Sequence, residues 1–565
     1  MSTDPDRDEA LARATIAAAA ASGITVFDTA HAYRRDDADL GHNERLLASA
    51  LRESGAHTRA RVVTKGGMTR PAGAWVPDGR AKSILADCEA SLEALDGLPI
   101  DLYLLHAPDP RTPWRTSVRA LARLLDEQLV SHVGLSNVNR AQLDEALELV
   151  PVTAVELGLG PLDDRPLRGG MVERCADLGI AVVAHSPLGG PRRAGGLGRR
   201  EALAEISRRC AATPAEVGLA WLLDLDPAIV AIPGARRPET ARSSARAATL
   251  ELDAEARMDL RRAFGGTRPA RLVSKPASDC TDAEVVLIMG IPGAGKSRVA
   301  QDYVARGYAR LNRDERGGAL RDLADALNDE LSRGAHRVVL DNTYLTRSAR
   351  SYVIETASRH GIATRCTWLD TSLAEAQVNL VERLLDELGA LPAPDELRRL
   401  ARNRSGLLAP ASQMRTAREL EPPSTDEGFT CVEKIEFTRA PSPDRARPGV
   451  FIAAAALERE GWERAVADGD PGAPHLLFHW SPGATPETLD AAVANLARHT
   501  TGPIERALCP HPAGPPICWC RPPLPGLPLA FARAHDLDPS RSVLIGTGPA
   551  HRNLAAALGA RNVGL

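Results

Sequence analysis

The chain has 565 residues, of which 44% are apolar and 25% are charged. At about 100 to 200 residues per domain, this length predicts three to five folding units. The composition is typical of globular proteins and excludes wholesale disorder, a collagen-like repeat and a membrane bundle. The net charge of -4 leaves no overall cationic field for a polyanion. Because no secretory signal is readable, we expect a cytoplasmic protein.

The first 265 residues alternate short apolar runs, typical of buried strands, with helical stretches. Strands are predicted at residues 24–27, 61–64, 102–105, 132–135, 152–155, 181–184 and 229–232. Repeated β/α units over this length favour a parallel barrel over an open sheet. A segment rich in Gly, Pro, Arg and Ser at 266–283 is the expected linker to the next domain.

Polar residues suited to chemistry follow the first three predicted strands, where barrel enzymes carry their active sites. They are Asp28 and Tyr33, then Lys65, then His106. A phenol is a poor proton donor at neutral pH unless a neighbouring cation stabilises its phenolate. Lys65 can supply that cation, Asp28 can keep Lys65 charged, and His106 can orient a carbonyl group.

Four motifs in this region resemble those of the aldo-keto reductases. They are F-D-T-A-H-A-Y at 27–33, V-V-T-K at 62–65, L-Y-L-L-H at 102–106 and G-L-S-N at 134–137. The resemblance covers nearly all of residues 8–262 and implies a (β/α)8 barrel that binds NADP(H) and transfers hydride to a small-molecule aldehyde or ketone. It implies that Tyr33 is the general acid, that Lys65 and Asp28 tune it, and that His106 positions the carbonyl.

The same resemblance implies a set of cofactor contacts. Ser136 and Asn137 would hold the nicotinamide amide, and Arg236 or Arg237 in A-I-P-G-A-R-R (231–237) would pair with a 2′-phosphate. Glu156 stands where the family usually has Gln, and its carboxylate would alter the hydrogen bonding of the nicotinamide amide.

The family's first barrel strand has no counterpart before Met1, so seven of the eight strands are expected. Two interpretations are open. Either the true start lies upstream, which we favour, or the barrel has a gap whose neighbouring strands expose unpaired edges.

A second α/β domain is predicted over residues 284–438. Its first apolar run, 285–289, is followed by G-I-P-G-A-G-K-S at 290–297, a complete phosphate loop. Glycines let backbone amides turn towards phosphate oxygens, the lysine reaches the transferred phosphate, and the serine can ligate Mg²⁺. These residues are Gly290, Gly293, Gly295, Lys296 and Ser297. The expected ligand is ATP with Mg²⁺, or another nucleoside triphosphate.

Two further motifs, L-N-R-D-E at 311–315 and V-L-D-N-T at 339–343, are similar to polynucleotide 5′-hydroxyl kinases of the phage type and their small-molecule relatives. By this resemblance Asp314 is the base that accepts the hydroxyl proton, and Asp341 assists Mg²⁺ or the nucleotide. Arg383, in a helix expected at 375–388, matches a lid arginine. E-P-P-S-T-D-E-G-F at 421–429 looks like the end of these kinase domains.

The phosphate acceptor is left open between a small alcohol and a polynucleotide 5′ end. Against a polynucleotide, the domain shows no interleaved aromatic stacking residues. The arginines at 398–404 can equally be a solvated helix face.

The last domain is expected at 450–565, after a Pro-rich join at 439–449. One loop carries Cys509, His511, Cys518 and Cys520 in a C-x-H-x6-C-x-C arrangement. Thiolate and imidazole ligands suit tetrahedral Zn²⁺, and a closed set of four indicates a structural site. Reduced cysteines in an ordinary loop are the alternative.

With C-R-P-P-L-P-G at 520–526 and S-V-L-I-G-T-G-P-A-H at 542–551, this loop resembles the zinc-bearing haloacid-dehalogenase-type phosphatases of sugar and histidinol phosphates. Those enzymes need two aspartates after the first strand, and here the positions are Ala453 and Ala455. The family's lysine falls at Pro522, and its metal-binding aspartates fall at Thr547 and His551. The expectation is a non-catalytic, haloacid-dehalogenase-like α/β domain.

These observations predict an α/β protein with two active sites, one for NADP(H)-dependent carbonyl reduction and one for ATP-dependent phosphorylation of a hydroxyl. One alternative is a scaffold that senses both nucleotides without efficient turnover. Another is a nucleic-acid end-repair kinase with the barrel as an accessory. No membrane contact is predicted, and the oligomeric state is not indicated.

Overall fold

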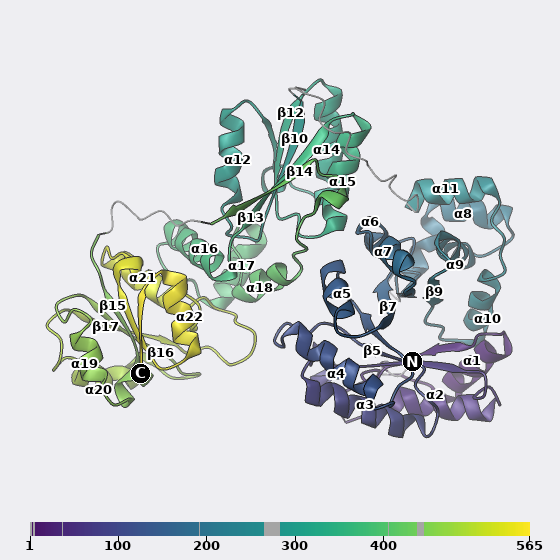
Figure 1. The fold of residues 1–565 in the computed structure, drawn as a ribbon, viewed down its shortest axis with the longest axis horizontal. Helices are drawn as coiled ribbons and strands as arrows, with labels where there is room; N and C mark the ends of the chain where they lie inside the picture. The colour runs from purple at the N-terminus through teal and green to yellow at the C-terminus, as the bar shows by residue number, and fades with distance from the viewer. Residues whose placement is uncertain are drawn as a thin grey trace. The chain divides into compact units, whose positions relative to one another are not determined.

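A computed structural model describes residues 3, 6–36, 38–190, 193–264, 283–404, 406–437 and 446–565. The chain forms two compact units, Met1–Arg271 and Leu272–Leu565 (Figure 1). Of the two predicted linkers, 266–282 and 439–445 lie outside the described residues. Within the described part of the chain, every helix is too short or too polar for a membrane crossing.

The first unit contains a parallel sheet of seven strands in the order β1-β2-β5-β6-β7-β8-β9. Their bounds are Val26–Asp28, Arg61–Gly66, Leu102–Leu105, Val133–Ser136, Val152–Gly158, Ala181–His185 and Ile229–Ile232. All seven predicted strands are therefore present, with ends shifted by up to three residues. A short antiparallel pair, β3 and β4 (Met68–Thr69 and Val76–Pro77), follows β2.

Helices surround this sheet (Figure 1). They are α1 Glu9–Ala21, α2 His42–Glu53, α3 Ala81–Leu95, α4 Trp114–Asp126, α5 Arg140–Leu147, α6 Arg165–Arg168, α7 Met171–Leu178, α8 Glu201–Arg209, α9 Pro214–Leu225, α10 Pro238–Ala247 and α11 Ala254–Phe264. Capping residues in the local sequence determine where several of these helices begin. In α9, Thr213 and Glu216 form a reciprocal capping box, and Pro214 occupies the first helical position.

The barrel has an open seam. Among the described residues β1 pairs only with β2, and β9 pairs only with β8. The outer layer continues past the seam, because α1 packs against both α2 and α10. Val26 on β1 is 36% exposed, as expected for an unpaired edge. The structure is thus a nearly closed parallel barrel, and its described residues contain the seven strands counted in the sequence.

The second unit contains two sheets, and the first carries the phosphate loop. Its parallel strands have the order β11-β12-β10-β13-β14, with bounds Ala309–Leu311, Arg337–Asp341, Glu284–Met289, Ala363–Asp370 and Cys431–Glu436. On β10, alternate residues face opposite layers. Val285 and Leu287 pack with helices α14 (Leu320–Ser332) and α15 (Arg347–Arg359), whereas Val286 packs with α12 (Lys296–Ala305). Strand β11 was not predicted.

The motif at 421–429 anchors this domain. Arg350 on α15 is fully buried and donates two hydrogen bonds, of 2.7 and 2.8 Å, to the carboxylate of Glu427. Its remaining nitrogen donates to three backbone carbonyls, those of Tyr344, Leu345 and Glu421. Because the buried guanidinium is satisfied on every side, the motif has a structural explanation.

The last sheet is also parallel, in the order β17-β16-β15-β18-β19. The bounds are Ile504–Cys509, His475–Trp480, Val450–Ala453, Val543–Gly546 and Arg561–Gly564. Helices α19 (Trp462–Ala467) and α20 (Asp490–Leu496) pack with Val450 and Ile452 on one face. Helices α21 (Gly526–Ala534) and α22 (Pro549–Leu558) pack with Phe451 on the other. Strands β16 and β17 were not predicted.

Candidate active sites and metal site

Three predicted catalytic side chains lie at the carboxyl ends of neighbouring barrel strands. Asp28 ends β1, Lys65 lies one residue before the end of β2, and His106 follows β5. The Nζ of Lys65 is 2.5 Å from Oδ2 of Asp28 and 3.5 Å from the hydroxyl oxygen of Tyr33, and it donates to the carbonyl of Thr29 at 3.2 Å. The structure therefore brings the predicted phenol, ammonium and carboxylate together.

Burial dominates the electrostatics of this cluster. It raises the pKa of Tyr33 to about 12 and that of Asp28 to about 7, although the Lys65 ammonium opposes both rises. Burial also acts to lower the pKa of Lys65, but the negative partners led by Asp28 outweigh it and raise that pKa. Burial lowers the pKa of His106 to about 3, with Lys65 and His185 adding to the effect. At neutral pH the phenol is protonated and the imidazole of His106 is uncharged.

A second group of polar side chains adjoins the first. Ser136 ends β6, and Asn137 follows it with a φ of 58°, a left-handed conformation that asparagine tolerates. The side-chain nitrogen of Asn137 donates to the carbonyl of His106 at 3.1 Å and to the hydroxyl of Ser136 at 3.0 Å. Glu156 on β7 places Oε2 3.1 Å from the Nζ of Lys65. The carboxylate at this unusual position therefore contacts the ammonium.

The two arginines predicted for the cofactor phosphate lie elsewhere on the same rim. Arg236 and Arg237 are exposed between β9 and α10, and Arg237 is the residue that precedes the first turn of that helix. An exposed pair of guanidinium groups beside a helix start is compatible with a phosphate ligand.

The phosphate loop runs from β10 into α12. Gly290, Gly293 and Gly295 have φ values of 154°, 89° and 93°, which residues with a β-carbon rarely adopt. At Gly293 a β-carbon would also collide with the backbone oxygen of Ala376. Ser297 lies in the exposed first turn of α12.

Lys296 folds back onto the phosphate loop. Its Nζ donates to the carbonyls of Gly290 and Ile291 at 3.0 and 2.9 Å. Burial lowers its pKa to about 8, and Arg383 adds to the effect while Asp341 opposes it. Arg383 lies on the exposed side of α16 (Leu373–Leu388). The cation is thus held against the loop carbonyls and would have to exchange these hydrogen bonds for a phosphate.

Asp341 has a partner that the sequence reasoning missed. Both of its oxygens accept hydrogen bonds from Arg310, at 3.0 and 2.8 Å, and its side chain is almost fully buried. Arg310 lies in the middle of β11, the strand that was not predicted. Asp314 lies on the short helix α13 (Arg313–Arg316) with its side chain 47% exposed. Asp341 is therefore committed to a buried ion pair, whereas Asp314 is exposed, with its Oδ1 3.5 Å from the guanidinium of Arg313.

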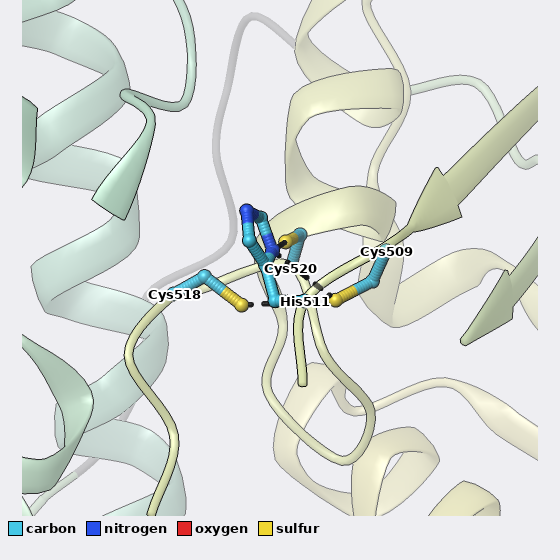
Figure 2. A group of neighbouring side chains, drawn as sticks. All are labelled: Cys509, His511, Cys518 and Cys520. Carbon is cyan, nitrogen blue, oxygen red and sulfur yellow. Dashed lines mark hydrogen bonds between the residues drawn. The ribbon is translucent and has the colours of Figure 1, made fainter. Parts of the chain in front are cut away.

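The four predicted metal ligands converge in the last domain (Figure 2). Their ligand atoms all lie within 4.8 Å of one another. The Sγ atoms of Cys509 and Cys518 are 3.7 Å apart, and Nδ1 of His511 is 3.5 Å from Cys509 Sγ and 3.2 Å from Cys520 Sγ. A tetrahedral Zn²⁺ with Zn–S distances of about 2.3 Å holds its sulfurs about 3.8 Å apart. The cluster therefore fits a zinc ion.

The positions that align with the carboxylates of the resembling phosphatases lie after strands of the last sheet. Ala453 ends β15, and Ala455 lies in the short helical turn after it. After β18, the amide of Thr547 donates to Nδ1 of His551 at 3.2 Å. Methyl groups, a hydroxyl and an imidazole occupy Ala453, Ala455, Thr547 and His551, so none of these four positions supplies a carboxylate as nucleophile or Mg²⁺ ligand.

Comparison with known proteins identifies the first domain. The model described as the aldo/keto reductase family matches residues 3–263. Probable aldo-keto reductase 1 of Glycine max is 31% identical over 242 residues, which cover 38% of this chain and 67% of the relative. Through residues 3–263, the chain belongs to the aldo/keto reductase family. Aldo-keto reductase str7 of Strobilurus tenacellus is 29% identical over 267 residues, covering 42% of this chain and 76% of the relative.

Solved aldo-keto reductases also match the reductase domain. The thermostable aldo-keto reductase Tm1743, in complex with the inhibitor epalrestat, is 29% identical, with a TM-score of 0.41 over 46% of this chain and 90% of that one. An aldo/keto reductase from Klebsiella pneumoniae, in complex with NADP and acetate, is 23% identical, with a TM-score of 0.40 over 47% and 88%. Residues 285–402 match a model described as an AAA domain, in agreement with the phosphate loop.

Two residues at the reductase site were missed in the sequence. Trp75, between β3 and β4, contacts the rings of Tyr33 and His106 edge-on, with centroid distances of 6.2 and 5.8 Å. It is 49% exposed. His185 ends β8, and its Nε2 is 3.2 Å from Oδ1 of Asn137. The available signal for His185 was its position at a strand end, whereas Trp75 lies in a loop whose course the sequence did not indicate.

Proposed function

We propose that the chain is a two-site enzyme that reduces a small-molecule carbonyl with NADP(H) and transfers the γ-phosphate of ATP to a hydroxyl. Membership of the aldo/keto reductase family supports an oxidoreductase activity in residues 3–263. The match to an AAA domain and the phosphate loop support nucleotide binding in the second unit. The substrates of both reactions are part of the proposal.

In the reductase site, Tyr33 donates a proton to the carbonyl oxygen as the carbonyl carbon is reduced. The Lys65 ammonium, 3.5 Å from the phenol oxygen, stabilises the negative charge that develops there. Asp28 holds Lys65 in place through their 2.5 Å contact. His106 is neutral, so it can orient the carbonyl by hydrogen bonding without a competing charge.

The residues present fit NADP(H), which supplies the hydride when it is bound. Nδ1 of His106 is buried with no hydrogen-bond partner among the described residues, so the site has hydrogen-bonding capacity for ligands. Ser136 and Asn137 would hold the nicotinamide amide, and Arg236 or Arg237 would pair with the 2′-phosphate. Glu156, which stands where the family usually has Gln, contacts Lys65 at 3.1 Å.

The contact of Lys65 with both Tyr33 and Asp28 carries the reductase proposal. The test is oxidation of NADPH by the purified chain over a panel of aldehydes and ketones, with Tyr33→Phe as the variant. We expect loss of reduction with NADPH binding retained. Activity of Tyr33→Phe close to that of the wild type would contradict the assignment.

In the kinase site, we assign the acceptor's proton to Asp314, whose exposed carboxylate is open to an incoming hydroxyl. Lys296 would leave the loop carbonyls for the phosphates, Ser297 would ligate Mg²⁺, and Arg383 would neutralise charge on the transferred group. Asp341, paired with Arg310, would act on the nucleotide or Mg²⁺ through a partly neutralised carboxylate.

A γ-phosphate transfer screen over small alcohols and 5′-hydroxyl oligonucleotides tests this assignment. Asp314→Asn should abolish transfer, whereas Asp325→Asn, an exposed carboxylate on α14, should not. Transfer to oligonucleotides alone would favour end repair. ATP binding with no transfer to either acceptor would favour the sensing scaffold.

For the last domain, residues 450–565, we propose that a zinc ion stabilises the fold and that the domain is not catalytic. The convergence of the four ligand atoms supports it. The fold resemblance to haloacid-dehalogenase-type phosphatases belongs to the same proposal, as do the domain boundaries at 265, 284, 438 and 450.

A further inference from the structure

The last sheet shares its core with helices that carry part of the kinase site. Helices α16 and α17 (Pro394–Asn403) contribute buried side chains such as Leu384 and Leu397 to the same cluster as β15, α21 and α22, and α18 (Pro410–Arg418) adds the partly buried Met414. An ion pair between Asp386 and Arg533 adds a surface contact. The helix that bears Arg383 is therefore embedded in the core of the last sheet.

The cysteine loop makes a directed contact with this helical segment. Trp519 lies between the predicted ligands Cys518 and Cys520 and is 3% exposed. Its indole nitrogen donates to the carbonyl of Leu408 at 3.0 Å, just before α18. The amide of Ala411 donates to the carbonyl of Pro516 at 3.3 Å. The start of α18 is thus fixed by two hydrogen bonds to the loop that holds the cysteines.

From α18 the contacts continue to the phosphate loop. Gln413 is fully buried, and its side-chain nitrogen donates to the carbonyl of Pro292 at 2.9 Å. On α16, Asn379 donates to the carbonyl of Gly293 at 2.8 Å. In a trans peptide the N–H points away from the preceding carbonyl. Holding the Pro292 carbonyl therefore turns the amide of Gly293 to the opposite side of the loop.

We propose that Trp519 and Gln413 are positioning residues for the phosphate loop, through which the last domain sets the affinity of that loop for nucleotide. The route runs from the cysteine loop through Leu408 and α18 to Pro292. The inference rests on the proposed binding of ATP. The last domain would then support nucleotide binding rather than catalysis. The backbone amides of a phosphate loop bind phosphate well when they are already oriented towards it.

The test measures ATP–Mg²⁺ affinity of the full chain by calorimetry. Trp519→Phe removes the indole N–H that donates to Leu408, together with one of the two fused rings. Gln413→Met keeps the length of the side chain but removes the N–H that donates to Pro292. Each variant should weaken ATP binding about fivefold, as expected for loss of one buried hydrogen bond. The double variant should bind ATP about as weakly as either single variant, because both break the same route.

Matched controls separate positioning from general damage. Trp462→Phe changes a tryptophan of similar burial in a different core of the last domain, and Gln377→Met changes a buried glutamine on α16 whose side-chain nitrogen has no hydrogen-bond partner in the described part of the chain. Both should leave ATP affinity within twofold of the wild type. Zinc content should be equal in Gln413→Met and wild type, since Gln413 lies outside the cysteine loop.

Kinetics add a second readout once an acceptor is known, because a positioning role predicts a raised KM for ATP with kcat nearly unchanged. If the wild type binds ATP and both single variants bind it equally well, this inference is wrong but the kinase proposal stands. The inference is also wrong if the double variant loses affinity by the product of the two single losses. A wild-type chain that binds no ATP would remove the proposed kinase function as well. If Trp519→Phe loses zinc, Gln413→Met decides the question.

Discussion

Replacing Lys65 with methionine tests the electrostatic core of the reductase site. Its Nζ lies 3.5 Å from the phenol oxygen of Tyr33 and is fully buried. At an effective dielectric constant of about 20, an ammonium at this distance stabilises a phenolate by about 5 kcal/mol. If most of this energy is realised in the transition state, its loss lowers kcat by about three powers of ten. KM for the carbonyl should change little, because the charge develops only during the reaction.

The same substitution leaves the carboxyl group of Asp28 without its cation. Burial already raises the pKa of Asp28 to about 7, above its ordinary value near 3.8, and removal of Lys65 raises it further. A carboxyl whose folded-state pKa is raised binds more protons in the folded state, so the contribution to stability falls as pH rises through that window. Lys65→Met should therefore be more stable relative to wild type at about pH 5 than at about pH 8.

Both effects are measurable with one pair of variants. Carbonyl reduction is followed by NADPH absorbance, and stability by urea unfolding across pH. Lys82→Met, at an exposed lysine on α3, is the control and should match the wild type in both. A folded Lys65→Met chain that retains more than about a tenth of the wild-type kcat would refute the reasoning.

The other predictions concern stability and ligand binding. Burial lowers the pKa of His106 from 6.5 to about 3 in the folded state. The unfolded chain therefore binds more protons below about pH 6.5, and the free energy of unfolding falls with pH by up to about 1.4 kcal/mol per unit. His106→Gln should reduce this pH dependence in urea unfolding. Gly293→Ala, at a left-handed residue beside a backbone oxygen, should abolish ATP binding in calorimetry. Arg350→Met removes the bidentate partner of the buried Glu427, which keeps a 3.7 Å contact with Arg347, and should destabilise the second unit by about 3 kcal/mol. Cys518→Ser should reduce zinc content by mass spectrometry and lower the Tm of the last domain.

The strands that sequence periodicity predicted share a property. The seven barrel strands, and β10 and β15 in the second unit, are apolar runs bounded by polar or glycine-rich turns, so local composition was sufficient. The missed strands lie at or near sheet edges. Strand β16 contains the apolar run Leu476, Leu477 and Phe478 and could have been found in the sequence. In β11 and β17, charged residues interrupt the apolar pattern, Arg310 in the first and Glu505 and Arg506 in the second. Predicting them requires knowledge of the neighbouring strand that pairs with them.

The ordered reductase motifs, the complete phosphate loop and the Cys/His spacing could all be recognised in the sequence, because each depends on residues close together in the chain. The partners of those residues could not. The ion pair of Arg310 with Asp341, the edge-on contact of Trp75 with Tyr33, and the bond from Trp519 to Leu408 join segments that lie far apart in sequence. Only the packing of sheets and helices decides such pairs, since local periodicity specifies which face of an element is buried but not what it is buried against.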